Sequence, residues 1–485
     1  MDMRKVFKYF LALNFVLWCV VPLWRLSLPM DTQEALVWGK YCLWGTTKHP
    51  PFSGWIAYPF YLLTGQIDKA VYVLSPLFVT IGVWVIYKLA RCFLSENQAI
   101  MAALLQFGII YYGFSAVEFN VNVISVALWP LCALFFWRAY SEDKWRDWLL
   151  FGVFAALNLL NKYVSGVLLV SLAIFVVADK GVLKLLKNPK VYAAAAVCVL
   201  IVAPHLLWLW QNDFEMLNYI ASRNHVGKIT SFWRHIAYPL KFVGAQILFA
   251  AAALLIYGSF YAGGEKAVAV KNKTQGLFIG ATALAPVLIF ALIGAAQGTP
   301  LKSMWGFPCL FMAGIALFYF FPMRWNEHRE KIFVTTVGCV SVLFAAAYIV
   351  QSLLTTSIRF QTPVEKVASE LVQKYEQTTN RKPRYVGGNV WYADMVALYA
   401  DKEIKPMIWL SPKNNPWLDA ADFEQNGALV VAESADEYAA YQKQYRQKIS
   451  EPHIIRLELK NYFGKTKIKE VFYGFYAPEE DENAE

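Results

Sequence analysis

Acidic and basic side chains stand in short polar segments between long apolar runs, and these segments could carry out acid–base chemistry. The first begins at Asp31, with Glu34 three residues later. A positioned carboxylate can take the proton that a hydroxyl group loses as it attacks, which accelerates such a step by roughly 10²–10⁴-fold. The same spacing matches a helix capping box, in which both acids would only satisfy backbone groups. The spacing alone leaves catalysis and capping both open.

Cationic side chains in similar segments could hold a phosphate group. Lys48 and His49 precede a Pro-Pro pair, and Lys162, followed by Tyr163, separates two apolar runs that are each too short to span a membrane. The alternative for Lys48 or His49 is an interfacial charge before a turn. The alternative for Lys162 is a turn exposed to water.

Weaker candidates lie in three other polar segments. Glu118 stands between apolar runs, where an ionisable group is costly and often functional, and the alternative is a solvated loop acid. Basic residues among Trp and Tyr, namely Arg223, His225 and later Lys302, suit an anionic lipid head group or ordinary anchoring at the interface.

Several motifs are missing, and their absence narrows the chemistry. No P-loop, dinucleotide fingerprint, HExxH or GxSxG motif stands in a usable context, so we expect no nucleotide. The seven cysteines include no CxxC pair, which argues against a zinc site or a disulfide framework. We also expect no apolar run to carry a buried ionisable side chain of the kind that proton-coupled transporters need.

The composition is that of a membrane protein. Of 485 residues, 58% are hydrophobic and 16% are charged, whereas soluble chains are about 45–50% apolar and about 25% charged. A membrane helix needs roughly 20 residues, and the apolar runs predict about eleven crossings, with 149–161 and 163–178 as the arms of a short hairpin. The runs are 6–24, 70–94, 99–116, 121–139, 149–161, 163–178, 191–210, 240–262, 274–297, 304–322 and 332–354.

Charge and composition also predict the orientation and the domains. Basic clusters at 4–8, 88–91, 138–146, 180–190, 266–273 and 324–331 are those that the positive-inside rule assigns to the cytoplasm. An odd number of crossings then places 355–485 outside, together with the connection 25–69. We therefore predict a transmembrane domain over 1–354 and a periplasmic α/β domain over 355–485 with an acidic, disordered tail at 478–485. Its strands are expected at 384–388, 406–410, 428–432, 454–459 and 471–476, and its helices at 364–375 and 435–447.

An ordered set of motifs resembles a known superfamily. The sequence is similar to bacterial membrane glycosyltransferases of the protein-O-mannosyltransferase-like superfamily (glycosyltransferase family 39, GT-C fold), in particular lipopolysaccharide galacturonosyltransferases and, more distantly, the aminoarabinose transferase of lipid A. The matching segments are Asp31-x-x-Glu34-Ala, His49-Pro-Pro with Trp55, Trp148-Leu-Leu-x-Gly152, Asn161-Lys-Tyr163, Pro204-x-x-x-Trp208, Ala245-Gln246, Trp305-x-x-Pro308, Pro416-Trp-Leu-Asp419 and Gly427-Ala428.

The resemblance implies an inverting sugar transfer at the periplasmic face of the bacterial inner membrane. The donor would be a sugar on a polyprenyl-phosphate carrier, and the acceptor would be lipid A, lipopolysaccharide or another envelope molecule. Asp31 would be the catalytic base, assisted by Glu118 or Glu34. Membrane lipids are the other expected partners, and no nucleic acid is expected.

The resemblance also suggests how the donor phosphate is held. Lys162 and Tyr163 would lie near it, and His49 stands where relatives place His or Lys before Pro-Pro. One position departs from the family: relatives commonly carry an aspartate that aligns with Asn122, and an amide binds a metal less well than a carboxylate does. Either Glu118 replaces that acid or metal dependence is weakened, so a divalent metal ion stays open as a cofactor.

Two other functions are compatible with many crossings. A transporter or flippase for a lipid-linked sugar needs the helices but no acid and base at the outer face, and it would more often show broken midplane helices and paired halves. A binding subunit that has lost activity is the other alternative, and Asn122 is its best support.

Overall fold

The chain forms two compact units. The computed structural model describes residues 2–224, 231–267, 272–445 and 448–477. Unit 1 consists of Met1–Pro22, Tyr72–Gln211 and Leu217–Tyr348, and unit 2 of Leu23–Val71, Asn212–Met216 and Ile349–Glu485. The predicted acidic tail at 478–485, residues 268–271 of one basic cluster and residues 446–447 lie outside the described residues.

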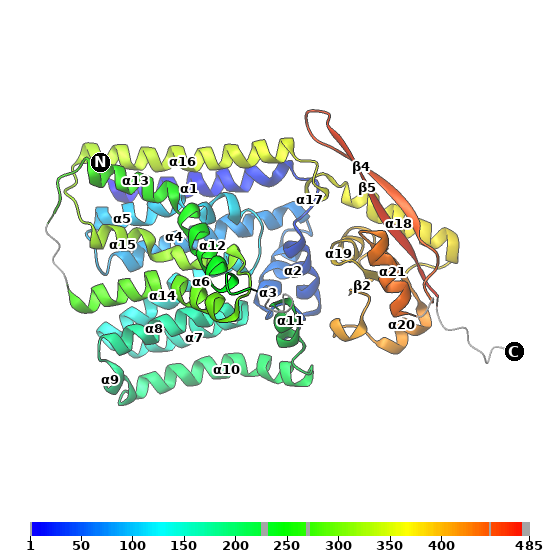
Figure 1. Ribbon diagram of the computed structural model, residues 1–485, viewed down its shortest axis with the longest axis horizontal. Helices are drawn as coiled ribbons and strands as arrows, with labels where there is room; N and C mark the ends of the chain where they lie inside the picture. Colours follow the sequence, from blue (N-terminus) through cyan, green and yellow to red (C-terminus); the bar gives the residue numbers. More distant parts are fainter. Residues whose placement is uncertain (1, 225–230, 268–271, 446–447, 478–485) are drawn as a thin grey trace. The chain divides into compact units, whose positions relative to one another are not determined.

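Unit 1 is helical. Its elements, labelled as in Figure 1, are α1 (Met3–Val20), η1 (Val21–Trp24), α4 (Leu74–Ala90), α5 (Glu96–Leu104), η3 (Leu105–Gly108), η4 (Ile110–Tyr112), η5 (Phe114–Ala116), α6 (Val121–Glu142), α7 (Trp145–Asn161), η6 (Tyr163–Ser165), α8 (Gly166–Ala178), α9 (Val182–Leu186), α10 (Pro189–Gln211), α11 (Glu215–Asn224), α12 (Arg234–Phe249), α13 (Ala251–Ala262), α14 (Lys273–Gln297), η7 (Ser303–Met312), α15 (Ala313–Phe320) and α16 (Glu327–Leu354).

Fewer helices than expected are long enough to span a membrane. Among the described residues seven are long and apolar enough, and α12 with α13, bent by 61°, adds an eighth if the pair is one span. Three of the eleven predicted runs form shorter pieces. Residues 99–116 divide between α5 and the 3-10 turns η3 to η5, while α7 has 17 residues and the apolar helix over Tyr163–Ala178 is also short. The predicted fold class, a polytopic helical membrane protein with a C-terminal sheet domain, is confirmed.

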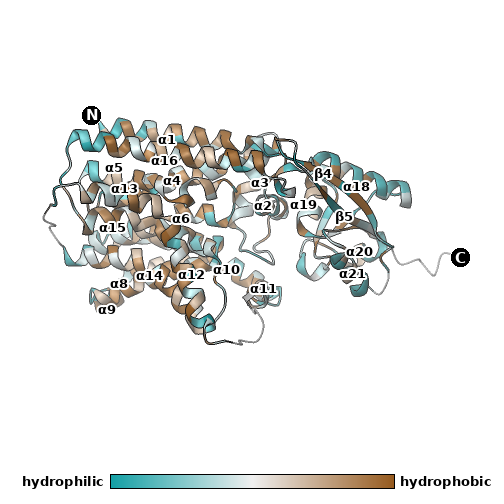
Figure 2. Ribbon diagram, turned by 45° about the horizontal axis from the view of Figure 1, so that its top comes forward, coloured by the Kyte–Doolittle hydropathy of each residue, from teal (hydrophilic) through white to brown (hydrophobic). Residues whose placement is uncertain are grey.

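The two ends of unit 1 carry different groups. At the end that we call the basic end, Arg4 of α1 pairs with Glu96 of α5 at 2.7 Å, and the neighbouring Asn97 donates to Glu330 of α16 at 3.0 Å. At the opposite end, which we call the Lys162 end, Asn161 at the end of α7 donates to the backbone oxygen of Val121 at 2.8 Å. Figure 2 shows hydrophobic residues along the helices and hydrophilic residues near the N-terminus.

Unit 2 contains a five-stranded mixed sheet. Its strands are β1 (Tyr385–Gly388), β2 (Lys405–Ile408), β3 (Ala428–Ala432), β4 (His453–Lys460) and β5 (Thr466–Tyr476), in the order β2-β1-β3-β5-β4. The pairs β1–β2 and β1–β3 are parallel, and β3–β5 and β4–β5 are antiparallel. All five predicted strands are confirmed. Strand β5 begins earlier than predicted because its polar first half, 466–470, pairs with β4.

Helices cover both faces of this sheet. The central strand β3 is buried along its whole length, so its side chains alternate between two apolar cores. Leu429 and Val431 pack with Leu371 and Val396, whereas Val430 packs with residues of the other helices. The helices are α2 (Met30–Tyr41), α3 (Phe52–Leu63), α17 (Ile358–Gln361), α18 (Val364–Thr379), α19 (Val390–Tyr399), α20 (Ala420–Asn426) and α21 (Ala435–Gln444), with the 3-10 turns η2 (Asp68–Val73) and η8 (Pro412–Asn414).

Candidate functional site

Helix α2 of unit 2 carries the two acids of the first polar segment, and the capping interpretation of them is wrong. The helix begins at Met30 after Pro29, whose side chain makes no capping hydrogen bond. Asp31 therefore lies inside the first turn, half-buried, where a negative charge is favoured by the positive end of the helix dipole. Glu34 has a different partner.

Glu34 forms a buried ion pair with Lys48. The Lys48 ammonium group contacts a Glu34 carboxylate oxygen, and the two side chains are 9% and 3% exposed respectively. The ammonium group also lies 5.4 Å from the ring centre of Trp409. Loss of either partner would leave the other charge buried and unpaired, which is costly. The pair therefore fixes the position of the loop that follows α2 and carries Lys48.

A third ionisable group, Asp394, lies near this pair and was not predicted from the sequence. It stands on α19, which packs against α2, and it is fully buried. Neither of its carboxylate oxygens has a hydrogen-bond partner among the described residues. Burial and then the negative charge of Glu34 raise the pKa of Asp394 well above its ordinary value, and Lys48 lowers it. A single acid within the apolar stretch 390–399 is the sequence signal that could have found it.

His49 is held beside this cluster by its backbone. Its N–H donates to the hydroxyl oxygen of Thr46 at 3.0 Å, and the Thr46 hydroxyl donates to the His49 backbone oxygen at 2.9 Å. Its half-buried imidazole meets the ring of Trp38 edge-on, with ring centres 6.1 Å apart. Unit 2 thus brings together Asp31 and Glu34 on one helix and Lys48 and His49 on the loop that follows it.

In unit 1, Lys162 and Asn122 are in direct contact. The Lys162 ammonium group donates to the side-chain oxygen of Asn122 at 2.6 Å. Asn122 lies in the first turn of α6, which Asn120 caps by accepting from the N–H of Asn122 at 2.9 Å and from that of Val123 at 3.3 Å. Lys162 ends α7, so the contact joins the tip of the predicted hairpin to the start of α6.

Tyr163 binds a histidine that the motifs do not single out. Its hydroxyl contacts Nε2 of His205 on α10, and His205 is fully buried. The His205 ring stacks on Trp208, with planes 12° apart. The expectation that no apolar run carries a buried ionisable side chain is therefore wrong for α10. A lone His within 191–210 was the available signal.

The remaining candidates come from three other segments. Glu118 is half-buried in the connection before α6, and Lys302 is exposed just before η7. Arg223 belongs to α11, and His225 lies outside the described residues. Unit 1 therefore brings together Lys162, Asn122 and Tyr163.

The described residues do not assemble a metal site. Within them no group of three or more His, Cys, Asp or Glu side chains could hold an ion. The side-chain oxygen of Asn122 accepts a hydrogen bond from the Lys162 ammonium group. A cationic side chain therefore already occupies the oxygen that a metal ion would need as a ligand.

The fold has a clear counterpart among solved structures. ArnT from Cupriavidus metallidurans, solved bound to undecaprenyl phosphate and also in the apo state, matches 98% of this chain and 98% of its own, with a TM-score of 0.63 in both cases and 13% and 12% identity. The chain is therefore a multi-pass membrane protein with the GT-C fold.

Sequence comparisons agree with this class. Residues 48–208 match the family described as dolichyl-phosphate-mannose-protein mannosyltransferase. The lipopolysaccharide core galacturonosyltransferase RgtA of Rhizobium johnstonii (strain DSM 114642 / LMG 32736 / 3841) is 23% identical over 399 residues, 79% of this chain and 78% of RgtA. RgtB of the same organism is 23% identical over 300 residues, 59% of each chain. The predicted resemblance is confirmed: the chain is similar to membrane glycosyltransferases and has the GT-C fold.

Proposed function

We propose that this chain transfers a sugar from a polyprenyl-phosphate carrier to a lipopolysaccharide-type or other envelope acceptor at the periplasmic face of the bacterial inner membrane. The similarity to RgtA, named as a lipopolysaccharide core galacturonosyltransferase, over 79% of the chain carries this proposal. The undecaprenyl phosphate bound to ArnT in its solved structure supports the class of donor. The names of the two relatives make galacturonic acid the first sugar to test.

In the proposed step, the acceptor oxygen attacks the anomeric carbon on the face opposite the phosphate, so the configuration at that carbon inverts. The acceptor O–H bond breaks and its proton passes to the Asp31 carboxylate. The bond between the anomeric carbon and the phosphate oxygen breaks, and its electron pair leaves with the polyprenyl phosphate. Glu34, which is paired with Lys48, acts in this proposal as a positioning residue, and Glu118 stays a candidate for a second acid.

The leaving phosphate gains negative charge, so preorganised cations would lower the barrier. We assign this role to Lys162, which Asn122 orients, with Tyr163 and His205 beside it on η6 and α10. His49 is the candidate cation of unit 2, because the Lys48 ammonium group already contacts Glu34. Arg223 and Lys302 are assigned to the head group of a lipid substrate.

The test compares the wild-type chain with Asp31→Asn in membranes supplied with undecaprenyl-phosphate-linked, radiolabelled galacturonate and lipopolysaccharide as acceptor. We expect the amide to lower the turnover rate by roughly 10²-fold or more, since it accepts no proton, while the amount of protein stays the same. Asp436→Asn, at an exposed acid on α21, removes the same charge and should leave transfer unchanged.

Three outcomes would contradict the proposal. Unchanged transfer by Asp31→Asn would remove this carboxylate as the base. Movement of the lipid-linked sugar across liposomes without a covalent product would favour a flippase. Binding of the carrier by the wild-type chain without turnover on any sugar of a polyprenyl-phosphate panel would favour an inactive binding subunit.

A further inference from the structure

A large cavity opens at the basic end of unit 1, away from Lys162, Asn122 and Tyr163 of the same unit. Its volume is about 1020 Å³, at the upper limit of the usual range for small-molecule pockets, about 300–1,000 Å³. None of the 17 residues that line it is among the proposed catalytic or donor-binding groups. On α6, residue 122 lies 16 residues from Arg138, which corresponds to about 24 Å along the helix axis.

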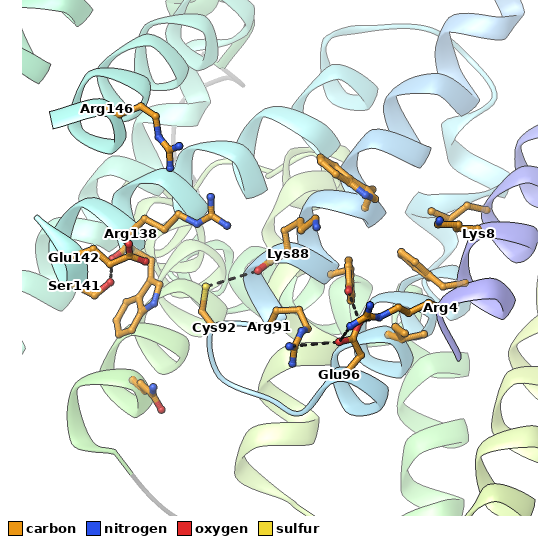
Figure 3. Close-up of a pocket in the computed structure, with 17 residues that line it drawn as sticks. Arg4, Lys8, Lys88, Arg91, Cys92, Glu96, Arg138, Ser141, Glu142 and Arg146 are labelled. Atoms are coloured by element: carbon orange, nitrogen blue, oxygen red, sulfur yellow. Dashed lines mark hydrogen bonds and ion pairs between the residues drawn. The ribbon is translucent and has the colours of Figure 1, made fainter. Parts of the chain in front are cut away.

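Cationic side chains from four helices converge on this cavity. Six line it, against the two carboxylates Glu96 and Glu142, so the lining carries a net charge of +4. Figure 3 shows Lys88 and Arg138 directed into the same space. The six are Arg4 and Lys8 of α1, Lys88 of α4, Arg91 just after α4, Arg138 of α6 and Arg146 of α7.

Carboxylates neutralise only part of this charge. Glu96 binds Arg4 through both of its oxygens at 2.8 and 2.7 Å and lies 3.5 Å from Arg91. Hydrogen bonds from Arg4 and Tyr87 lower the pKa of Glu96 to about 2, so this acid is ionised at neutral pH. Glu142 pairs with Lys144 at 2.5 Å, and Lys144 is not one of the residues that line the cavity.

Within the described part of the chain, three cations of the cavity form no ion pair with a carboxylate. Arg146 lies 3.1 Å from the buried Asp147, but no ion pair joins Lys8, Lys88 or Arg138 to an acid among the described residues. Lys88 instead lies over the rings of Trp84 and Tyr87, at 5.3 and 5.4 Å. Like charges held together repel one another, so a bound anion would stabilise this arrangement.

The rest of the lining is apolar and suits the upper part of an acyl chain. Trp84, 49% exposed, stands beside Lys88, and the buried Leu11 and Ile100 lie deeper between the helices. Cations above an apolar wall match a phospholipid, whose phosphate is followed by glycerol and hydrocarbon. Basic pockets between transmembrane helices on the cytoplasmic side bind anionic lipid head groups in other membrane proteins.

We propose that this cavity binds the phosphate of an anionic phospholipid head group, at the membrane face that the positive-inside rule assigns to the cytoplasm. The clusters at 4–8, 88–91 and 138–146 thus do more than set the orientation of the chain. To set the orientation of the chain, the cytoplasmic loops need only be positively charged, and their side chains need not line one cavity. The proposal is independent of the proposed transferase reaction, since it involves the opposite end of unit 1.

The experiment uses the full-length protein in a neutral detergent. Native mass spectrometry and thermal unfolding are measured with added phosphatidylglycerol, phosphatidylcholine or inorganic phosphate. The variant Lys8→Gln/Lys88→Gln/Arg138→Gln removes the three cations without an acidic partner. Its matched control, Lys180→Gln/Lys184→Gln/Lys187→Gln, removes three charges before, within and after α9, outside the cavity lining.

We expect phosphatidylglycerol to bind the wild-type chain and raise its unfolding temperature, whereas phosphatidylcholine does neither. Affinity for phosphatidylglycerol should fall at least about tenfold in the cavity variant and stay unchanged in the control. If the triple variant fails to fold, the single variants Lys8→Gln and Lys88→Gln replace it, each with a smaller expected loss.

The proposal is overturned if wild-type protein does not distinguish the two lipids, or if the cavity variant and its control lose the same affinity. If inorganic phosphate alone stabilises the wild-type chain as strongly as phosphatidylglycerol does, and the cavity variant abolishes that effect, the site binds a soluble phosphate compound and the lipid assignment is wrong.

Discussion

The buried carboxyl of Asp394 gives the molecule a specific pH dependence. An aspartate in the unfolded chain loses its proton near pH 3.9, whereas burial and Glu34 raise the pKa of Asp394 in the folded protein. Above about pH 4 the folded state therefore holds a proton that the unfolded state has lost. Because stability falls with rising pH wherever the folded state binds more protons, this group destabilises the protein progressively until the pH exceeds its folded pKa.

Asp394→Asn should remove this penalty, since the amide does not ionise. We expect the variant to unfold at a higher temperature than wild type at pH 8, with the difference closing toward pH 4. The gain should be about 1.4 kcal/mol for each unit by which the folded pKa exceeds the unfolded one. Thermal unfolding of the purified protein from pH 4 to pH 8 measures it, with Asp436→Asn as an exposed control. A difference that does not change with pH would contradict the assigned protonation.

At this scale the sequence identified some groups and missed others for a physical reason. Asp31 and Lys162 stand in polar segments that interrupt apolar runs, so residue type and position single them out. Asp394 and His205 are single polar residues within apolar stretches, and their significance comes from burial against segments far away in the chain. The capping role considered for Glu34 was wrong for the same reason: Glu34 pairs with Lys48 through tertiary packing and does not cap the helix.

Among the elements, the close contact between α7 and α10 explains a glycine of the family motif. A Cβ at Gly152 would lie against the backbone carbonyl of Ala194 on α10, closer than real Cβ atoms approach a backbone atom. Small residues permit this approach between membrane helices. The contact matters beyond packing because α7 ends beside Lys162 and α10 carries His205.

Gly152→Ala should therefore push the two helices apart. We expect it to destabilise the protein by about 1–3 kcal/mol and to lower sugar transfer, since Lys162 and His205 move with their helices. Gly166→Ala is the matched control, because nothing lies within 4 Å of a Cβ at that position. Thermal unfolding and the transfer assay measure both effects. Equal behaviour of the two variants would show that the α7–α10 contact does not position these groups.

Helices and strands could be predicted where the residue pattern of a short segment indicates them. All five strands of unit 2 follow short apolar runs and were found, as was α18. Helix α19 was missed because it is buried on nearly all sides, with every residue of Val390–Ala397 buried, so it lacks the one-sided periodicity of a surface helix. Apolar composition also does not reveal where 3-10 turns break a run such as 99–116.

For the whole molecule, the sequence placed a boundary at residue 354, whereas the compact units follow packing. Residues 23–71 belong to unit 2 because α2 packs against α19 and because the Thr47 hydroxyl donates to the backbone oxygen of Asn414 at 2.6 Å. Tyr399 likewise donates to Asp68 at 3.0 Å. These contacts join segments that are distant in the chain, so no local pattern announces them. The membrane side of residues 355–485 stays a prediction.

The length and direction of helix α16 support a periplasmic position for residues 355–485. Glu330 near its start binds Asn97 at the basic end of unit 1, which the positive-inside rule assigns to the cytoplasm. The helix has 28 residues, about 42 Å, which exceeds the roughly 30 Å of the hydrocarbon core. Residues after Leu354 should therefore begin on the periplasmic side.

Reporter fusions test this orientation. Alkaline phosphatase fused at the C-terminus should be active, and green fluorescent protein fused there should be dark. The same two reporters fused after Lys144, at the basic end, should behave in the opposite way. A fluorescent C-terminal fusion would reverse the orientation, and both the proposed periplasmic transfer and the cytoplasmic position of the lipid cavity would then be wrong.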